Sequence, residues 1–157
     1  MQFDFRTLNY RDVAEVRAYL GLLYAISAEG DPYHFERTEE FIDRAVIKAR
    51  REEDESNTFA GLALARRGHA PEIVGLHILR RFEEGPLVGA HIGGLWVAED
   101  CRRQGVARRL KAMGEAWARS IGATFLNTNV LVDNERMLAF NRSLGFFDYR
   151  VNLRKLL

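Results

Sequence analysis

The chain has little of several features that mark whole classes of protein. Its 157 residues contain one cysteine, Cys101, so no disulfide can form within the chain and a reducing compartment is expected. No apolar run is long enough to cross a bilayer, and residues 1–6 lack the basic and apolar regions of a signal peptide. We therefore expect a cytoplasmic protein with no membrane partner.

The chain also has no large excess of positive or negative charge. Lys and Arg total 23 against 22 for Asp and Glu, a formal net charge of +1, which gives no general attraction to nucleic acid. Hydrophobic residues make up 47% and charged residues 29% of the chain, as in globular proteins. This length and composition predict one domain over residues 1–157. We expect no metal cofactor.

Apolar spacing and turn residues predict a regular order of elements. Strands are expected over residues 3–8, 59–65, 73–79, 87–97, 124–132 and 146–153, and helices over residues 13–23, 38–49, 106–121 and 135–144. The order is β-α-α-β-β-β-α-β-α-β. Antiparallel strands come first and strand–helix alternation comes later, which predicts a mixed α/β sheet. The pattern by itself fits several folds.

The most informative segment is the junction between the strand ending at Val97 and the helix beginning at Val106. The first amides of a helix have no partner within the helix, so with the helix dipole they form an anion site. Gly105 leaves room for a phosphate to approach the backbone. Basic side chains are expected around this site: Arg102, Arg103, Arg108, Arg109 and Lys111. The alternative is that these residues form a solvated helix face.

This junction resembles the GNAT superfamily of N-acetyltransferases. Arg102-x-x-Gly105-x-Ala107 matches the R/Q-x-x-G-x-G/A signature of that family, and Leu95-x-Val97 matches the strand before it. A second motif of the family, N-x(4)-A-x(5)-GF, is matched by Asn134, Ala139, Phe140, Leu144, Gly145 and Phe146. The resemblance covers residues 87–147 well and the first half of the chain only in its order of elements.

The resemblance implies a GNAT-like acyl-CoA N-acyltransferase fold with acetyl-CoA as co-substrate. The backbone amides of six residues would hold the CoA pyrophosphate: Arg103, Gln104, Gly105, Val106, Ala107 and Arg108, next to Arg102. Main-chain groups of Leu95, Trp96 and Val97 would pair with the pantetheine arm where two neighbouring strands splay apart. Asn134 would lie near this arm, or serve as an ordinary helix N-cap.

Paired glycines precede this stretch of the strand. Gly93 and Gly94 are typical of a bulge or a close backbone approach. The alternative is a sheet surface packed tightly against a helix.

The match to the family fails at one position. Many members have a tyrosine four residues before the glycine of the second motif, where it protonates the departing thiolate, and this chain has Asn141. An amide has no proton that titrates near neutral pH, although it can hydrogen-bond the thiolate or a bridging water. His91 is the candidate general base, with a half-buried strand histidine as the alternative. His77 is expected to lie farther from the thioester.

The reaction implied is direct transfer of an acetyl group to an amine in a ternary complex. The acceptor, a small molecule or a peptide amine, would meet the first two helices and their connection. Candidate contacts there are Tyr24, Glu29, Asp31, Tyr33, His34, Glu36, Glu39 and Glu40, or these form a solvated surface. The family also makes a homodimer plausible. The alternative functions are a non-catalytic acyl-CoA sensor and, against the charge balance, a nucleic-acid-binding domain.

Overall fold

A computed structural model describes residues 2–28, 38–51 and 56–155 of the chain. The chain divides into two compact units, Met1–Asn127 and Thr128–Leu157. The expected acceptor contacts between Glu29 and Glu36 lie outside the described residues.

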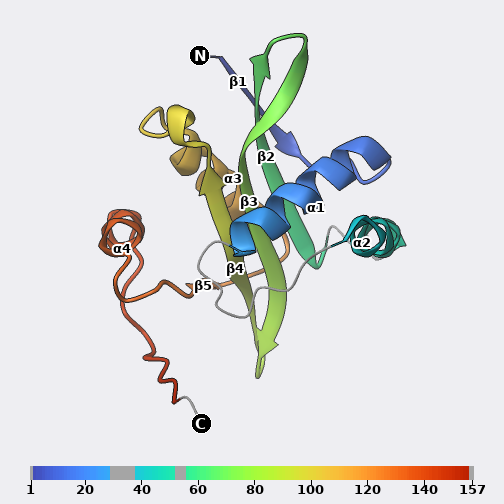
Figure 1. Cartoon of the computed structure of the whole chain (residues 1–157). Helices are drawn as coiled ribbons and strands as arrows, with labels where there is room; N and C mark the ends of the chain where they lie inside the picture. Colours follow the sequence, from blue (N-terminus) through green and yellow to red (C-terminus); the bar gives the residue numbers. More distant parts are fainter. Residues whose placement is uncertain (1, 29–37, 52–55, 156–157) are drawn as a thin grey trace. The chain divides into compact units, whose positions relative to one another are not determined.

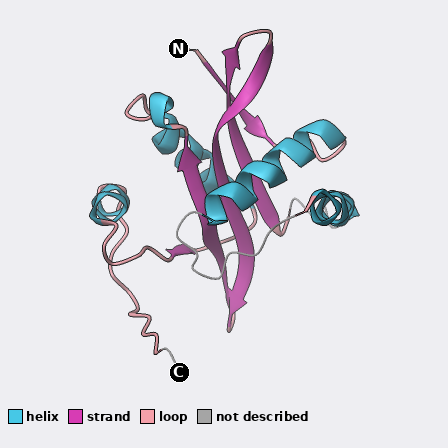
Figure 2. Cartoon of the chain, viewed as in Figure 1, coloured by secondary structure: helices cyan, strands magenta, loops and turns pink. Residues whose placement is uncertain are grey.

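The first unit contains a twisted sheet (Figure 2). The sheet has five strands in the order β1-β2-β3-β4-β5. Its strands are β1 Phe3–Thr7, β2 Thr58–Arg67, β3 Ala70–Glu84, β4 Leu87–Val97 and β5 Phe125–Thr128. The pairs β1–β2, β2–β3 and β3–β4 are antiparallel. β5 follows a helix after β4, the connection that parallel neighbours require, so the sheet is mixed as predicted.

Helices cover both faces of this sheet. The first face packs against α1 Val13–Ala28 and α2 Glu39–Arg51, and the second against α3 Val106–Ser120. Figure 1 shows α1 crossing in front of β3 and β4, with α3 behind them. This arrangement confirms the expected α/β layers.

Residue size along β2 differs between the two faces. Leu62 and Leu64 point into the core beneath α1 and α2, whereas Ala63 and Ala65 point toward α3. A Cβ added at Gly75 in β3 would lie 3.0 Å from Leu110 Cδ1, so α3 approaches the sheet closely. The start of α3 is held tightly against the sheet for this reason.

The second unit is described over residues 128–155, where it contains α4 Glu135–Arg142 and no strand beyond Thr128, the last residue of β5. The predicted strand over residues 146–153 is therefore wrong. Its apolar residues Phe147, Tyr149, Val151 and Leu153 alternate as in a strand but are exposed. Alternation makes a segment suitable for a sheet, but a strand forms only where a partner supplies the hydrogen bonds.

The other element boundaries follow the predictions with differences in length. β3 is longer than expected and β5 is shorter, ending at Thr128 rather than residue 132. Among the described residues, no helix has the length and apolar character needed to cross a membrane.

Candidate active site

The bulge predicted from paired glycines is present in β4. Ile78 of β3 pairs with Gly94, but the next residue, Leu79, pairs with Ile92, so Gly93 is the extra residue. An extra residue bends a strand and increases its twist. Gly93 and Gly94 have no side chains, so nothing at this point of β4 resists the bend.

The main-chain groups of β4 after the bulge point alternately to its two sides. The Ala98 amide donates to Val74 O of β3 at 2.8 Å, so Ala98 faces β3. Because successive residues of a strand present their polar groups to opposite sides, Trp96 and Gly94 also face β3. Leu95 and Val97 therefore present their amides and carbonyls to the other side of β4.

On that other side, the edge of β4 continues past the end of its neighbour β5. β5 begins beside the start of β4, where the Thr124 amide donates to Val88 O at 2.9 Å. β5 has 4 residues and β4 has 11, so β4 continues past the end of β5. A β-strand edge of this kind can receive an extended ligand through its main chain.

The turn between β4 and α3 has an unusual backbone. A short 3-10 helix, η1 Glu99–Cys101, leads into Arg103 with φ 61° and then Gly105 with φ 82°. Two left-handed residues so close together curve the chain so that successive amides converge, a conformation that binds anions. The Arg109 amide donates to the carbonyl of the cap residue, Gly105 O, at 3.0 Å. The amides of residues 106–108 therefore face outward from the helix start.

Side chains fix this turn to the sheet. Arg67, at the end of β2, donates to both carboxylate oxygens of Asp100 at 2.5 and 2.6 Å and to Cys101 Sγ at 3.4 Å. Gln104 Nε2 donates to Asp100 O at 3.0 Å, and Arg102 Nε donates to Val97 O at 2.9 Å. Arg102 and Gln104 thus hold the turn through their side chains, and the Arg102 amide is itself used within the turn, where it donates to Glu99 O at 3.2 Å.

The expected ring of basic residues is only partly present. Arg103, Arg108 and Arg109 are exposed, whereas Lys111 is only 7% exposed and lies on the buried side of α3. Burial lowers the pKa of Lys111 to about 8, against a smaller opposing effect from Glu115. The expectation that Lys111 belongs to the basic surface around the turn is therefore wrong.

Cys101, next to the turn, is fully buried in the core beneath α3. This is the position of a small packing residue.

His77 in β3 has a role that the sequence did not indicate. It is 1% exposed, and its Nδ1 lies 2.9 Å from Gly94 O, the carbonyl next to the bulge. A carbonyl only accepts, so Nδ1 carries the proton and donates it. Burial, together with the charge of Lys111, lowers the pKa of His77 to about 4, although the bond to Gly94 opposes this change. His77 is thus neutral at physiological pH.

His91 lies on the opposite face of the sheet from His77. It pairs with Arg80 of β3, which is two residues from Ile78, a member of the core under α1. Residues two apart in a strand, and residues directly opposite each other in a pair, share a face. His91 is therefore half-buried on the face that α1 covers.

Two further predicted residues belong to the second unit. Asn134 caps α4, since its Oδ1 accepts a hydrogen bond from the Met137 amide at 3.1 Å, so the N-cap interpretation is confirmed. Asn141 is 5% exposed, and its Oδ1 is the one buried side-chain nitrogen or oxygen atom among the described residues without a hydrogen-bond partner. Such an atom is suited to a ligand or water.

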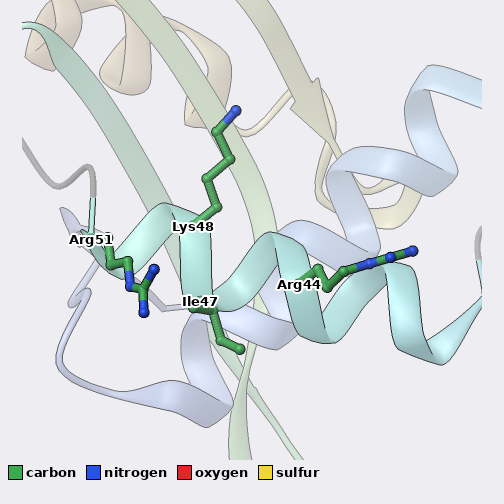
Figure 3. Close-up of a pocket in the computed structure, with 4 residues that line it drawn as sticks. All are labelled: Arg44, Ile47, Lys48 and Arg51. Atoms are coloured by element: carbon green, nitrogen blue, oxygen red, sulfur yellow. The ribbon is translucent and has the colours of Figure 1, made fainter.

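A hollow lies on the surface of α2. Arg44, Ile47, Lys48 and Arg51 line it. Figure 3 shows that these side chains point in different directions rather than converging. This hollow does not include the β4–α3 turn. In residues 2–28, 38–51 and 56–155, no group of three or more His, Cys, Asp or Glu side chains is placed to hold a metal ion.

The layered sheet, the bulged β4 and the left-handed turn before α3 agree with an acyl-CoA N-acyltransferase fold. A family model described as "Acetyltransferase (GNAT) family" matches residues 22–146, and the chain belongs to this family.

Similarity to individual proteins points to the same family. The chain is 34% identical over 59 residues to an aminoglycoside N(6')-acetyltransferase type 1 from Acinetobacter genomosp. 13. That match covers 38% of this chain and 40% of the relative, less than half of either protein.

Solved structures show the fold over the whole chain. A putative acetyl transferase from Pyrococcus furiosus is 18% identical with a TM-score of 0.75, covering 99% of this chain and 100% of the other. AAC(6')-Iy, in complex with the bisubstrate analogue CoA-S-monomethyl-acetylneamine, is 16% identical with a TM-score of 0.69, covering 100% and 99%. At these identities the similarity concerns the fold alone.

Proposed function

We propose that the chain is an acyl-CoA-dependent N-acetyltransferase that moves an acetyl group from acetyl-CoA to a primary amine in a ternary complex. The observation that carries this proposal is the turn between β4 and α3, with left-handed backbone at Arg103 and Gly105. Converging amides at a helix start suit a pyrophosphate, which the exposed Arg103 and Arg108 would neutralise further.

The β4 edge would hold the rest of the co-substrate. In this proposal, Leu95 and Val97 pair with the pantetheine arm, because their main-chain groups face away from β3. Val97 O already accepts one hydrogen bond from Arg102 and has one lone pair left, so Leu95 and the Val97 amide would be the main contacts. Trp96 would contribute its side chain rather than its backbone. Asn134 and Asn141 keep the roles that the family motif implies.

The chemistry requires little beyond alignment of the two reactants. The amine nitrogen attacks the thioester carbonyl carbon, the new C–N bond forms, and the C–S bond breaks to release CoA as a thiolate. The proton lost from the amine goes to a base or a water, and His91, on the α1 face, is the candidate base. Most of the rate would come from positioning the reactants together.

We propose a small cationic molecule, such as an aminoglycoside, as the acceptor. The matched relative carries the name of an aminoglycoside acetyltransferase, and a solved structure of similar fold holds the aminoglycoside sisomicin. Glu39 and Glu40 begin α2 as exposed carboxylates. Carboxylates of this kind attract polyamines.

Two glycines of similar geometry provide a direct test of the phosphate turn. Gly105 and Gly122 lie at the two ends of α3 with φ values of 82° and 78°, and an added Cβ would meet nothing within 4 Å at either position. Gly105→Ala and Gly122→Ala should therefore each lower the free energy of unfolding by about 1 kcal/mol. Only Gly105→Ala should weaken acetyl-CoA binding, by about tenfold or more, because its methyl group enters the phosphate position.

Isothermal titration calorimetry with acetyl-CoA measures this difference. Equal affinities in the two variants would show that the turn does not hold the pyrophosphate. Turnover is then followed as thiol release with a panel of amines that includes sisomicin and a peptide N-terminus. A wild-type protein that binds no acetyl-CoA would overturn the proposed function.

A second function is favoured by one residue. Asn141 stands where many members of the family have the tyrosine that acts as general acid. The absence of that tyrosine suits an acyl-CoA sensor without catalysis. Tight acetyl-CoA binding, with no thiol release above the rate without protein for any amine, would support the sensor.

A further inference from the structure

We propose that His77 is a positioning residue for acetyl transfer, because it sets the orientation of the peptide between Gly94 and Leu95. This inference rests on the proposed function. It assigns a task to a buried histidine that neither the phosphate turn nor the candidate base explains.

The peptide that His77 holds lies directly after the bulge. Its carbonyl, Gly94 O, accepts from His77 Nδ1 at 2.9 Å. Gly93 and Gly94 carry no side chains, and an added Cβ at either would have only distant neighbours, Ile78 O at 4.0 Å and Ile78 Cδ1 at 3.8 Å. Side-chain packing at these two glycines therefore adds little restraint to the peptide. It is restrained on the β3 side by the pairing of Gly94 with Ile78, next to the bulge, and by the hydrogen bond from His77 to Gly94 O.

The other end of the same peptide is the Leu95 amide. A trans peptide is planar, so its C=O and N–H groups point in opposite directions. With Gly94 O held toward β3, the Leu95 N–H points away from β3, to the side where β4 extends past β5. This is the direction from which an extended thioester ligand would approach β4.

An N–H in this position can donate to the oxygen of the thioester carbonyl as negative charge develops on it. Such donors act most strongly when they are fixed before the reaction begins. His77 supplies this fixation through the opposite end of the peptide. It does not touch the substrate.

The histidine is itself rigidly held. Its ring lies against α3 at Gly114, where an added Cβ would be 3.0 Å from His77 Nε2 and 2.9 Å from Cδ2. Phe59 packs edge-on to the ring, with centroids 6.4 Å apart. Thus Nδ1 cannot leave Gly94 O without displacing the helix or the aromatic ring.

A pair of amide variants separates this role from simple packing. In His77→Asn the amide nitrogen stands near the position of Nδ1 and can still donate to Gly94 O. In His77→Gln the amide is one methylene farther out, near the position of Nε2, and cannot make this bond with the same geometry. Both variants are polar, uncharged and similar in volume.

We expect His77→Asn to keep kcat within about threefold of wild type, and His77→Gln to lose about tenfold to a hundredfold in kcat. The Kd for acetyl-CoA, measured by calorimetry, should change less than about threefold in both, because the phosphate turn is untouched. The infrared carbonyl stretch of bound acetyl-CoA should lie at a lower frequency in wild type and His77→Asn than in His77→Gln.

Wild-type kcat and an unshifted carbonyl band in a folded His77→Gln protein would overturn this inference and leave the proposed function intact. Equal losses of kcat in both variants would also overturn it, because the bond to Gly94 would then not be the cause. Absence of acetyl-CoA binding by the wild-type protein would instead overturn the proposed function and this inference together.

Discussion

His77 makes the folded protein sensitive to acid in a way that can be calculated. Its pKa is lowered from 6.5 to about 4 in the folded state, chiefly by burial. Between these values the unfolded chain binds a proton that the folded protein does not bind. The free energy of unfolding therefore falls as the pH falls through this window, and this contribution is fully present only above about 6.5.

The expected magnitude follows from the two pKa values. Relative to neutral pH, the loss attributable to His77 is about 2 kcal/mol at pH 5 and about 3 kcal/mol at pH 4. A marginally stable domain of 5–15 kcal/mol would lose a substantial part of its stability, on the order of a quarter. Most of this change occurs between about pH 6 and pH 4.5.

Comparison with His77→Asn isolates this contribution. The variant retains a donor toward Gly94 O but does not titrate. Urea unfolding of both proteins, at a series of pH values from about 7.5 to 5, gives the difference in free energy at each pH. Carboxylates such as Glu15, whose pKa is lowered by its hydrogen bond to Arg6, also destabilise the fold in acid, but they are common to both proteins and cancel.

We expect the stability advantage of wild type over His77→Asn to shrink by about 2 kcal/mol from pH 7.5 to pH 5. A difference that stays constant over this range would refute the assignment of a buried neutral imidazole at residue 77. A difference that grows in acid would mean that the histidine is protonated more readily in the folded state, contrary to its burial.

Three other predictions concern residues in α1, α3 and at the start of α4. Gly114→Ala should destabilise the fold by about 1–3 kcal/mol, because its Cβ would lie 2.7 Å from Leu79 Cδ1; Gly21→Ala, in α1 with nothing within 4 Å, should stabilise it by about 0.5–1 kcal/mol. From pH 8 to 10.5, wild type should gain about 2–3 kcal/mol of stability relative to Lys111→Met, since the unfolded chain holds the lysine proton longer. Asn134→Ala should cost about 1 kcal/mol, and Asn134→Asp should restore the cap. Urea unfolding measures all three, and a reversed sign would contradict the contact concerned.

The sequence predicted the parts of the fold that depend on local chemistry. The junction from Val97 to Val106 was recognisable because a left-handed turn before a helix favours glycine, and the bulge was recognisable because paired glycines accommodate one. The Asn134 cap is likewise a local feature.

Features that depend on contacts distant in sequence were not predictable in this way. Lys111 looked like part of a basic surface, because the pattern does not show which side of α3 faces the sheet at that turn. His77 is 17 residues from the carbonyl that it binds, so no local pattern connects them. Apolar and polar residues alternate from Phe147 to Leu153 as in a strand. A strand would form there only if the edge of a sheet, distant in sequence, supplied hydrogen-bond partners for its backbone.

The two histidines near the bulge are separated by the sheet, and this separation decides which of them can take part in proton transfer. His77 faces α3, its Nδ1 proton is committed to Gly94 O, and a pKa of about 4 makes it a poor base near neutral pH. α3 also covers this face, so an amine cannot reach the imidazole there. In the proposed reaction, the acceptor therefore approaches β4 from the face that carries α1, where His91 lies. If the protein uses a histidine as its base, the sheet leaves His91 as the one of the two that can meet the amine, while His77 acts through the peptide bond.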